Sequence, residues 1–291
     1  MSPQVIGFLL MICAALFGGS VPSVSKIVLQ VFSPTQAFFM RVVVASILFA
    51  IFISVSKHRY SLKTFKSQWK VSLLMVVNSG CAIFALNYIP SALVPIIYAT
   101  IPLMTLIMLK YRDRSHTLSV YQLVGIITGF LGVLIATYGS LHTIAMAAHA
   151  WIGVGMILLG AFCFSLYSIL SKSMQQSSTP IHITFTMTLV ATIIMLPLGI
   201  IDFMQHDYFV YVQPKHVVAL LATGVIGTVA FYICYQYAIK KTSPQVASLF
   251  TYIQPVFAVG LSILLIGEQI TPIFITGSVL AIAGASLASK K

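Results

Sequence analysis

Long apolar runs follow one another along almost the whole chain, and short polar segments separate them. A helix that crosses a bilayer needs about 20 mainly apolar residues. Ten runs meet this requirement, with expected boundaries at 4–26, 34–56, 69–88, 92–110, 120–139, 150–171, 181–201, 215–238, 245–266 and 271–289. Lipid offers no partner for unpaired backbone groups, and the runs do not alternate strictly, so helices are expected rather than a barrel. The pattern predicts an all-α integral membrane protein with ten transmembrane helices.

The two halves of the chain repeat each other. Identical residues recur 153 positions apart in three places: Cys81 and Cys234, Ala85 and Ala238, Pro102 and Pro255. A second group recurs 146 positions apart: Ser25 and Ser171, Lys26 and Lys172, Pro34 and Pro180, Phe39 and Phe185. Each half carries five expected spans, and an odd number places the second half in the opposite orientation. We expect two inverted five-helix repeats, residues 1–145 and 146–291.

Composition and charge agree with a membrane location. The hydrophobic fraction is 59%, and the charged fraction is 7%, against roughly 25% charged residues in soluble domains. The net charge of +12 does not indicate nucleic acid, because the basic residues sit in the short loops. Thirteen fall on one side of the membrane, from the loop around 57–70 to Lys290 and Lys291, and only Lys26 and Lys215 fall on the other. The positive-inside rule therefore predicts that both termini face the cytoplasm.

The sequence offers little for catalysis. The four cysteines lie inside apolar runs without metal-ligand spacing. There is no paired carboxylate, no His-x-x-x-His, no Gly-rich phosphate loop and no G-x-S-x-G motif. We expect no enzyme activity, no cofactor and no metal site.

Arg41 is the most informative single residue, because it lies inside the second expected span. A cation there costs at least roughly 2.5–3.5 kcal/mol unless it finds a partner or reaches the interface. The four acids, Asp113, Asp202, Asp207 and Glu268, all lie outside the expected spans. Arg41 therefore either binds an anionic group of a substrate, or reaches outward or bonds to helix carbonyls.

Further candidates for a substrate cavity are polar or aromatic residues within the spans. Pro95, Pro102 and Pro255 each remove a helix hydrogen bond and free a carbonyl, which lipid does not tolerate but a wet cavity does. A simple kink for helix packing is the alternative reading. With Arg41, the candidate substrate-binding residues are Phe17, Asn78, Tyr98, Tyr167, Tyr232, Gln236 and Tyr252. For the aromatic members, ordinary packing is the alternative.

Several motifs resemble one known family. FMRVVVASILFA at 39–50 resembles its Arg-led second span, and SALVPIIYATIPL at 91–103 with QVASLFTYIQPVF at 245–257 resembles its fourth and ninth spans. GEQIT at 267–271 resembles its Gly-Glu after the ninth span. In this order, the motifs are similar to those of EamA-type transporters of the drug/metabolite transporter superfamily. The resemblance implies a carrier for a small molecule, located in the cytoplasmic (inner) membrane of a bacterium.

The expected function is a secondary transporter that moves a small metabolite by alternating access, with export of an amino acid or related compound favoured. A carrier for an anionic metabolite or a drug-like cation is the alternative within transport. A membrane enzyme or lipid-modifying protein is the alternative from another class, and it should show clustered acids or histidines near one face. The cavity should lie between the halves, walled by spans one to four and six to nine. Beyond the substrate and the bilayer, the partner is either none or a second copy through Gly125 and Gly129, although internal packing of these glycines is favoured.

Overall fold

The computed structural model describes residues 3–55, 60–112, 119–143, 149–267 and 271–288, so Glu268 and the expected boundary at 145/146 lie outside the described residues. Within these ranges every regular element is a helix. The first half contains α1 (Pro3–Val28), α2 (Pro34–Val55), α3 (Leu62–Ala85), α4 (Leu93–Tyr98), α5 (Ile101–Arg112) and α6 (Val120–Thr143). The second half contains α7 (Ala150–Met174), α8 (Pro180–Gln205), the 3₁₀ turn η1 (Tyr208–Val210), α9 (Pro214–Gly224), the π-helical turn η2 (Val225–Ala230), α10 (Phe231–Lys241), α11 (Pro244–Ser248), α12 (Phe250–Ile266) and α13 (Pro272–Ala288).

Eight segments among the described residues are long and apolar enough to cross a membrane. They include the continuous stretches 93–112 and 214–241, each built from more than one helical element. Apolar stretches of α6 and α13, Val120–Gly132 and Pro272–Gly284, are shorter. The chain is therefore an all-helical integral membrane protein, and the arrangement of ten spans in two repeats stays a prediction.

Three of the expected spans are interrupted. The fourth breaks at Ala99 and Thr100, just before Pro102, which has no N–H to bond a carbonyl of the preceding turn. By contrast, α12 runs through Pro255, and its break lies earlier, at Leu249. The eighth span contains η2, which no proline explains.

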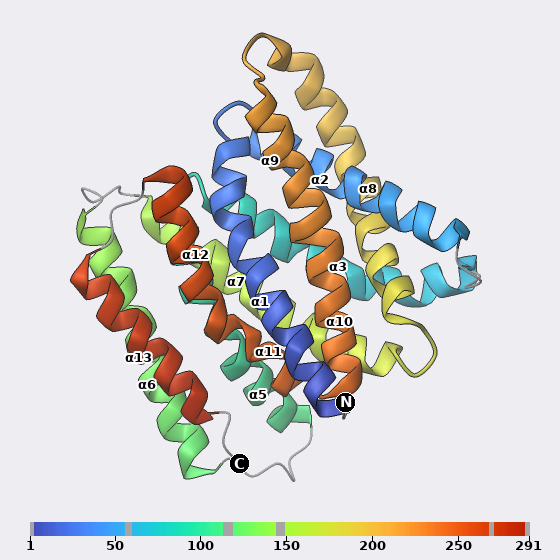
Figure 1. Cartoon of the computed structure of the whole chain (residues 1–291). Helices are drawn as coiled ribbons and strands as arrows, with labels where there is room; N and C mark the ends of the chain where they lie inside the picture. Colours follow the sequence, from blue (N-terminus) through green and yellow to red (C-terminus); the bar gives the residue numbers. More distant parts are fainter. Residues whose placement is uncertain (1–2, 56–59, 113–118, 144–148, 268–270, 289–291) are drawn as a thin grey trace.

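The helices of the first half pack mainly on helices of the second. In the first half, α1 packs on α10 and α12. The corresponding helix of the second half, α7, packs on α3 and on the pair α4 and α5. In addition, α2 packs on α8, and α6 packs on α13. The described ends of the chain, at α1 and α13, lie at the same end of the bundle, and the α1–α2 turn lies at the other (Figure 1). We call these the terminal end and the turn end.

Close glycine contacts join α6 to α13 at the edge of the bundle (Figure 1). A Cβ atom on Gly132 would lie 2.2 Å from the Ala281 nitrogen, and one on Gly284 would lie 2.2 Å from the Gly129 nitrogen. These glycines therefore allow the two backbones to touch. The expectation that the glycines of this span serve internal packing is confirmed for Gly129.

Asp202 is closer to the membrane segment than expected. Because α8 continues to Gln205, Asp202 lies in its last turn, and the prediction that it lies beyond the helix is wrong. Its Oδ2 accepts hydrogen bonds from Ser33 Oγ, at 2.9 Å, and from the Tyr208 hydroxyl. Burial, and then the hydrogen bond to Asp202, raise the pKa of Tyr208. The phenol therefore stays protonated and donates the hydrogen bond. The cluster ties the α1–α2 turn to the end of α8.

Candidate functional site

A cavity lies between the halves of the chain. Its wall comes from α1, α2, α3, α4, α5, α7, η2, α10 and α12. No described residue of α6 or α13 lines it, in agreement with the prediction for spans five and ten. The seventh span, α8, was expected in the wall and contributes no described lining residue.

Arg41 points into the bundle and is only 7% exposed. Its Nε donates to Thr228 Oγ1 at 2.7 Å, and its Nη2 donates to the Gly227 carbonyl oxygen at 3.3 Å. The alternative of an outward-reaching side chain is therefore wrong, and the alternative of bonding to a helix carbonyl is confirmed. Among the described residues Arg41 bonds through these two nitrogens, which leaves Nη1 for a ligand in the cavity that Arg41 lines.

The partners of Arg41 depend on the π-helical turn. A π turn replaces the usual i→i−4 bonding and often marks a functional site. Here the Thr228 hydroxyl donates to the Thr223 carbonyl oxygen at 3.0 Å, five residues earlier, while it accepts from Arg41. One threonine thus satisfies a backbone carbonyl and orients the guanidinium.

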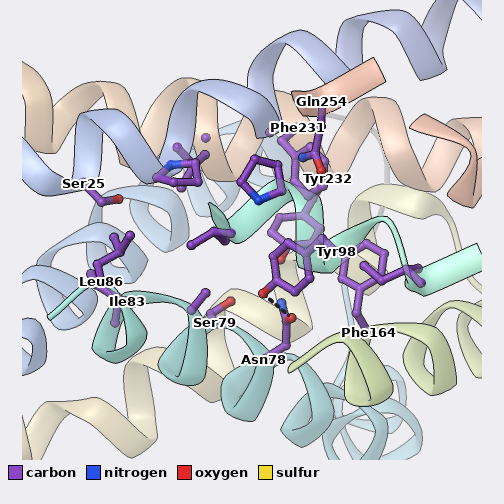
Figure 2. A pocket seen from close by; sticks show the side chains of 18 of the residues that line it. Ser25, Asn78, Ser79, Ile83, Leu86, Tyr98, Phe164, Phe231, Tyr232 and Gln254 are labelled. Carbon is purple, nitrogen blue, oxygen red and sulfur yellow. Dashed lines mark hydrogen bonds between the residues drawn. The ribbon is translucent and has the colours of Figure 1, made fainter. Parts of the chain in front are cut away.

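A polar cluster faces Arg41 in the cavity. The Tyr98 hydroxyl donates to Asn78 Oδ1 at 2.8 Å (Figure 2), and Tyr98 also interacts electrostatically with Tyr232. Both tyrosines lie close enough to the Arg41 guanidinium to interact with it electrostatically. Four predicted site residues from α2, α3, α4 and α10 are therefore brought together: Arg41, Asn78, Tyr98 and Tyr232.

Gln254 supplies another polar group to the cavity wall (Figure 2). It is 5% exposed, and its Oε1 has no hydrogen-bond partner among the described residues. A buried amide oxygen without a partner is costly and therefore calls for an explanation. A Cβ atom on Gly18 would lie 2.3 Å from Gln254 Nε2, so the glycine makes room for this amide.

The other predicted site residues do not line the cavity. Tyr167 and Gln236 are fully buried and bonded to each other, with Gln236 Nε2 donating to the Tyr167 hydroxyl at 3.0 Å. Phe17 packs against the same core cluster as Tyr167. Tyr252 is buried in a separate cluster with the residues around α4. For these four residues the structure thus offers packing roles.

Sequence reasoning missed several residues of the site. Gln254, directly before Pro255, was not among the candidates, and the three phenylalanines of the wall were not singled out: Phe164, Phe231 and Phe250. The 153-residue spacing places Phe231 opposite Asn78 in the repeat, which was the available signal. Thr228 had none, because the π turn that brings it to Arg41 is not visible in an apolar sequence.

The site can hold a small molecule by hydrogen bonds, charge and ring contacts. Its polar groups are a cation, amide groups and hydroxyls, and the surrounding wall is aromatic and aliphatic. Among the described residues, no three His, Cys, Asp or Glu side chains are grouped to hold a metal ion. A hollow of this kind inside a bundle of membrane-spanning helices is typical of membrane transporters.

The comparisons with known proteins agree with this class. The model of the EamA-like transporter family matches residues 5–138 and again residues 151–290, so the chain belongs to that family. The chain is 22% identical to the uncharacterized transporter YyaM of Bacillus subtilis, over 97% of this chain and 93% of that protein. It is 25% identical to the uncharacterized inner membrane transporter YedA of Escherichia coli K12, over 88% of this chain and 81% of that protein.

A solved crystal structure has the same fold. It superimposes with a TM-score of 0.71 at 15% identity and covers 99% of this chain and 96% of that chain. At this identity the likeness concerns the fold alone.

Proposed function

We propose that this protein is a secondary transporter that exports a small amphipathic metabolite, an amino acid or a close relative. The observation that carries the proposal is the pair of buried polar groups in one aromatic-walled cavity. Arg41 offers Nη1 to an anionic group such as a carboxylate, and Gln254 offers an unpaired oxygen to an N–H donor. An amino acid carries both groups beside an apolar side chain, which suits the phenylalanines of the wall.

Two alternative substrates would use different polar groups of the cavity. An anionic metabolite without an amine would use Arg41 and leave the Gln254 oxygen unpaired. A drug-like cation would meet the Arg41 guanidinium without an acid, because no described lining residue is Asp or Glu. Charge therefore favours the amino acid first and the anionic metabolite second.

Alternating access between two inverted halves is the proposed mechanism. Two observations support it. Corresponding helices of the two halves make corresponding contacts, and both halves match the same family model. We also propose that residues 1–145 and 146–291 are the two five-helix repeats and that both termini face the cytoplasm. The asymmetry of the loop charges supports this orientation.

The test is transport by the purified protein in lipid vesicles. The vesicles are loaded in turn with each of the twenty radiolabelled amino acids, with simple carboxylic acids and with hydrophobic cations, and efflux is measured against protein-free vesicles. We expect efflux of at least one amino acid, and strong loss of it in Arg41→Ala. Arg41→Lys should keep part of the activity if charge alone matters, and little if the fork geometry matters.

A matched variant separates the two polar groups. Gln254→Leu removes the acceptor for the amine and keeps the size, so it should slow efflux of the amino acid more than efflux of its deaminated carboxylic acid. Efflux of cations alone, or equal efflux by wild type and Arg41→Ala at matched amounts of protein, would contradict the proposed substrate.

A further inference from the structure

One end of the cavity is filled by aromatic rings. The ring centroid of Tyr235 lies 4.9 Å from that of Phe164 and 5.1 Å from that of Phe250. Tyr235 is fully buried. The Tyr235 hydroxyl shares a hydrogen bond of 2.7 Å with Ser168 Oγ. The same core cluster contains Met11 and neighbouring residues of the first half of α1, so these rings fill the terminal end.

The turn end of the cavity has small residues instead. The wall contributed by α1 and α3 includes Gly18, Val21, Ser79 and Ala82, and all four are partly exposed. They belong to the halves of α1 and α3 that run toward the turn end. The hollow therefore extends from the Arg41 cluster toward the turn end.

The repeat relates these two ends residue by residue. The spacings of 146 and 153 pair each small residue with a ring: Gly18 with Phe164, Val21 with Tyr167, Ser79 with Tyr232, and Ala82 with Tyr235. All four ring residues are buried, and all four small residues are partly exposed. In an inverted repeat, paired positions lie toward opposite ends of the cavity. The two ends therefore differ in side-chain size at matched positions.

We infer that the aromatic set, Phe164, Tyr167, Tyr232 and Tyr235, is a gate that only one end of the cavity possesses. The inference rests on the alternating access proposed above. No described residue that α1 and α3 contribute to the cavity wall at the turn end is aromatic, so this end closes when the backbones of α1 and α3 approach each other, which small residues permit. Opening the terminal end breaks ring contacts and the hydrogen bonds of Tyr235 and Tyr167. The empty protein consequently rests with the turn end open.

The physical reason is that the two ends bury unequal areas of side chain when they close. A buried aromatic side chain removes about 150–250 Å² from solvent, and ring pairs add favourable contacts. Glycine, serine and alanine at the matched positions of the turn end bury far less when that end closes. Substrate in the cavity is needed to supply the missing contacts.

The experiment measures access to the cavity and needs no substrate. Ser79→Cys is introduced in a background without the four native cysteines, and a membrane-impermeant maleimide is applied to right-side-out and to inside-out vesicles. We expect labelling from one side only. Tyr167→Val and Tyr235→Ala are then added, which places at these positions the residues found at the matched positions of the first half, Val21 and Ala82. This double exchange should raise the labelling rate from the protected side at least tenfold.

Matched variants keep the outcome interpretable. Tyr235→Phe retains the ring and should leave that side protected, and Phe274→Ala truncates a buried ring of α13, away from the cavity, and should do the same. The reverse exchange, Ala82→Tyr, should slow labelling from the accessible side. Each variant is used only if it elutes from gel filtration like its parent.

The inference fails if the parent is labelled equally from both sides or from neither. It also fails if neither Ala82→Tyr nor the double exchange changes the labelling rates. Because the maleimide reports access alone, a protein that transports none of the tested compounds would leave this result unaffected. Failure of the substrate proposal and failure of the gate are thus distinguishable.

Discussion

Replacing Thr228 by valine should destabilise the protein by removing the support of Arg41. Valine keeps the shape of threonine but has no hydroxyl, so Arg41 Nε and the Thr223 carbonyl both lose their partner. A hydrogen bond to a charged group contributes about 1.5–3 kcal/mol. Threonine to serine keeps the hydroxyl and removes one methyl group, which costs about 0.8 kcal/mol. Thr228→Val should therefore be clearly less stable than Thr228→Ser.

The assay is thermal unfolding in detergent, with tryptophan fluorescence as the readout. For a chain of this size, 1 kcal/mol corresponds to a Tm shift of about 2–4 °C. We expect Thr228→Val to unfold several degrees below wild type, with Thr228→Ser between them. A double-mutant cycle with Arg41→Met isolates the interaction, which should exceed about 1 kcal/mol. Equal Tm values for the valine and serine variants, or additive effects in the cycle, would refute the role of Thr228.

Three further outcomes are expected. Asp202→Asn weakens the hydrogen bonds from Ser33 and Tyr208 and should lower the Tm, whereas Asp207→Asn, an acid without these bonds, should not. A cysteine at Ser61, in the strongly basic loop region, should react with an impermeant thiol reagent in inside-out vesicles and not in intact cells; ready labelling of cells would reverse the proposed topology. A pH gradient of either sign should not drive uphill accumulation of a substrate that does not titrate, because no described lining residue is acidic; strong accumulation would direct mutagenesis first to Asp202.

The class of the protein and its family were predictable from the sequence because they depend on long stretches. Apolar runs and repeated motifs tolerate errors of a few residues at each end. The start of α3 at Leu62, seven residues before the expected 69, shows such an error. There Ser61 caps the helix by accepting from the Thr64 N–H at 3.2 Å, and polar residues of the first turns conceal the helix in a hydropathy profile.

The cavity was predictable only in part, because side-chain direction depends on local breaks. Arg41 and Tyr98 were identifiable as polar residues within apolar runs, but the partner of Arg41 follows from one extra residue in the turn at η2. Tyr167 and Gln236 have the same residue types as the cavity residues, yet they satisfy each other. Polarity alone does not distinguish a residue that awaits a ligand from one that already has a partner.

The backbone contact between α6 and α13 has a consequence for how this sequence can change over evolutionary time. Gly132 and Gly284 leave no room for a methyl group, whereas Leu123, Leu131 and other exposed residues of α6 have apolar surroundings that accept many side chains. A saturation mutagenesis scan read out as surviving protein should therefore show narrow bands of intolerance on two helices that do not line the cavity. Some of the most constrained positions of this transporter would then reveal nothing about what it carries.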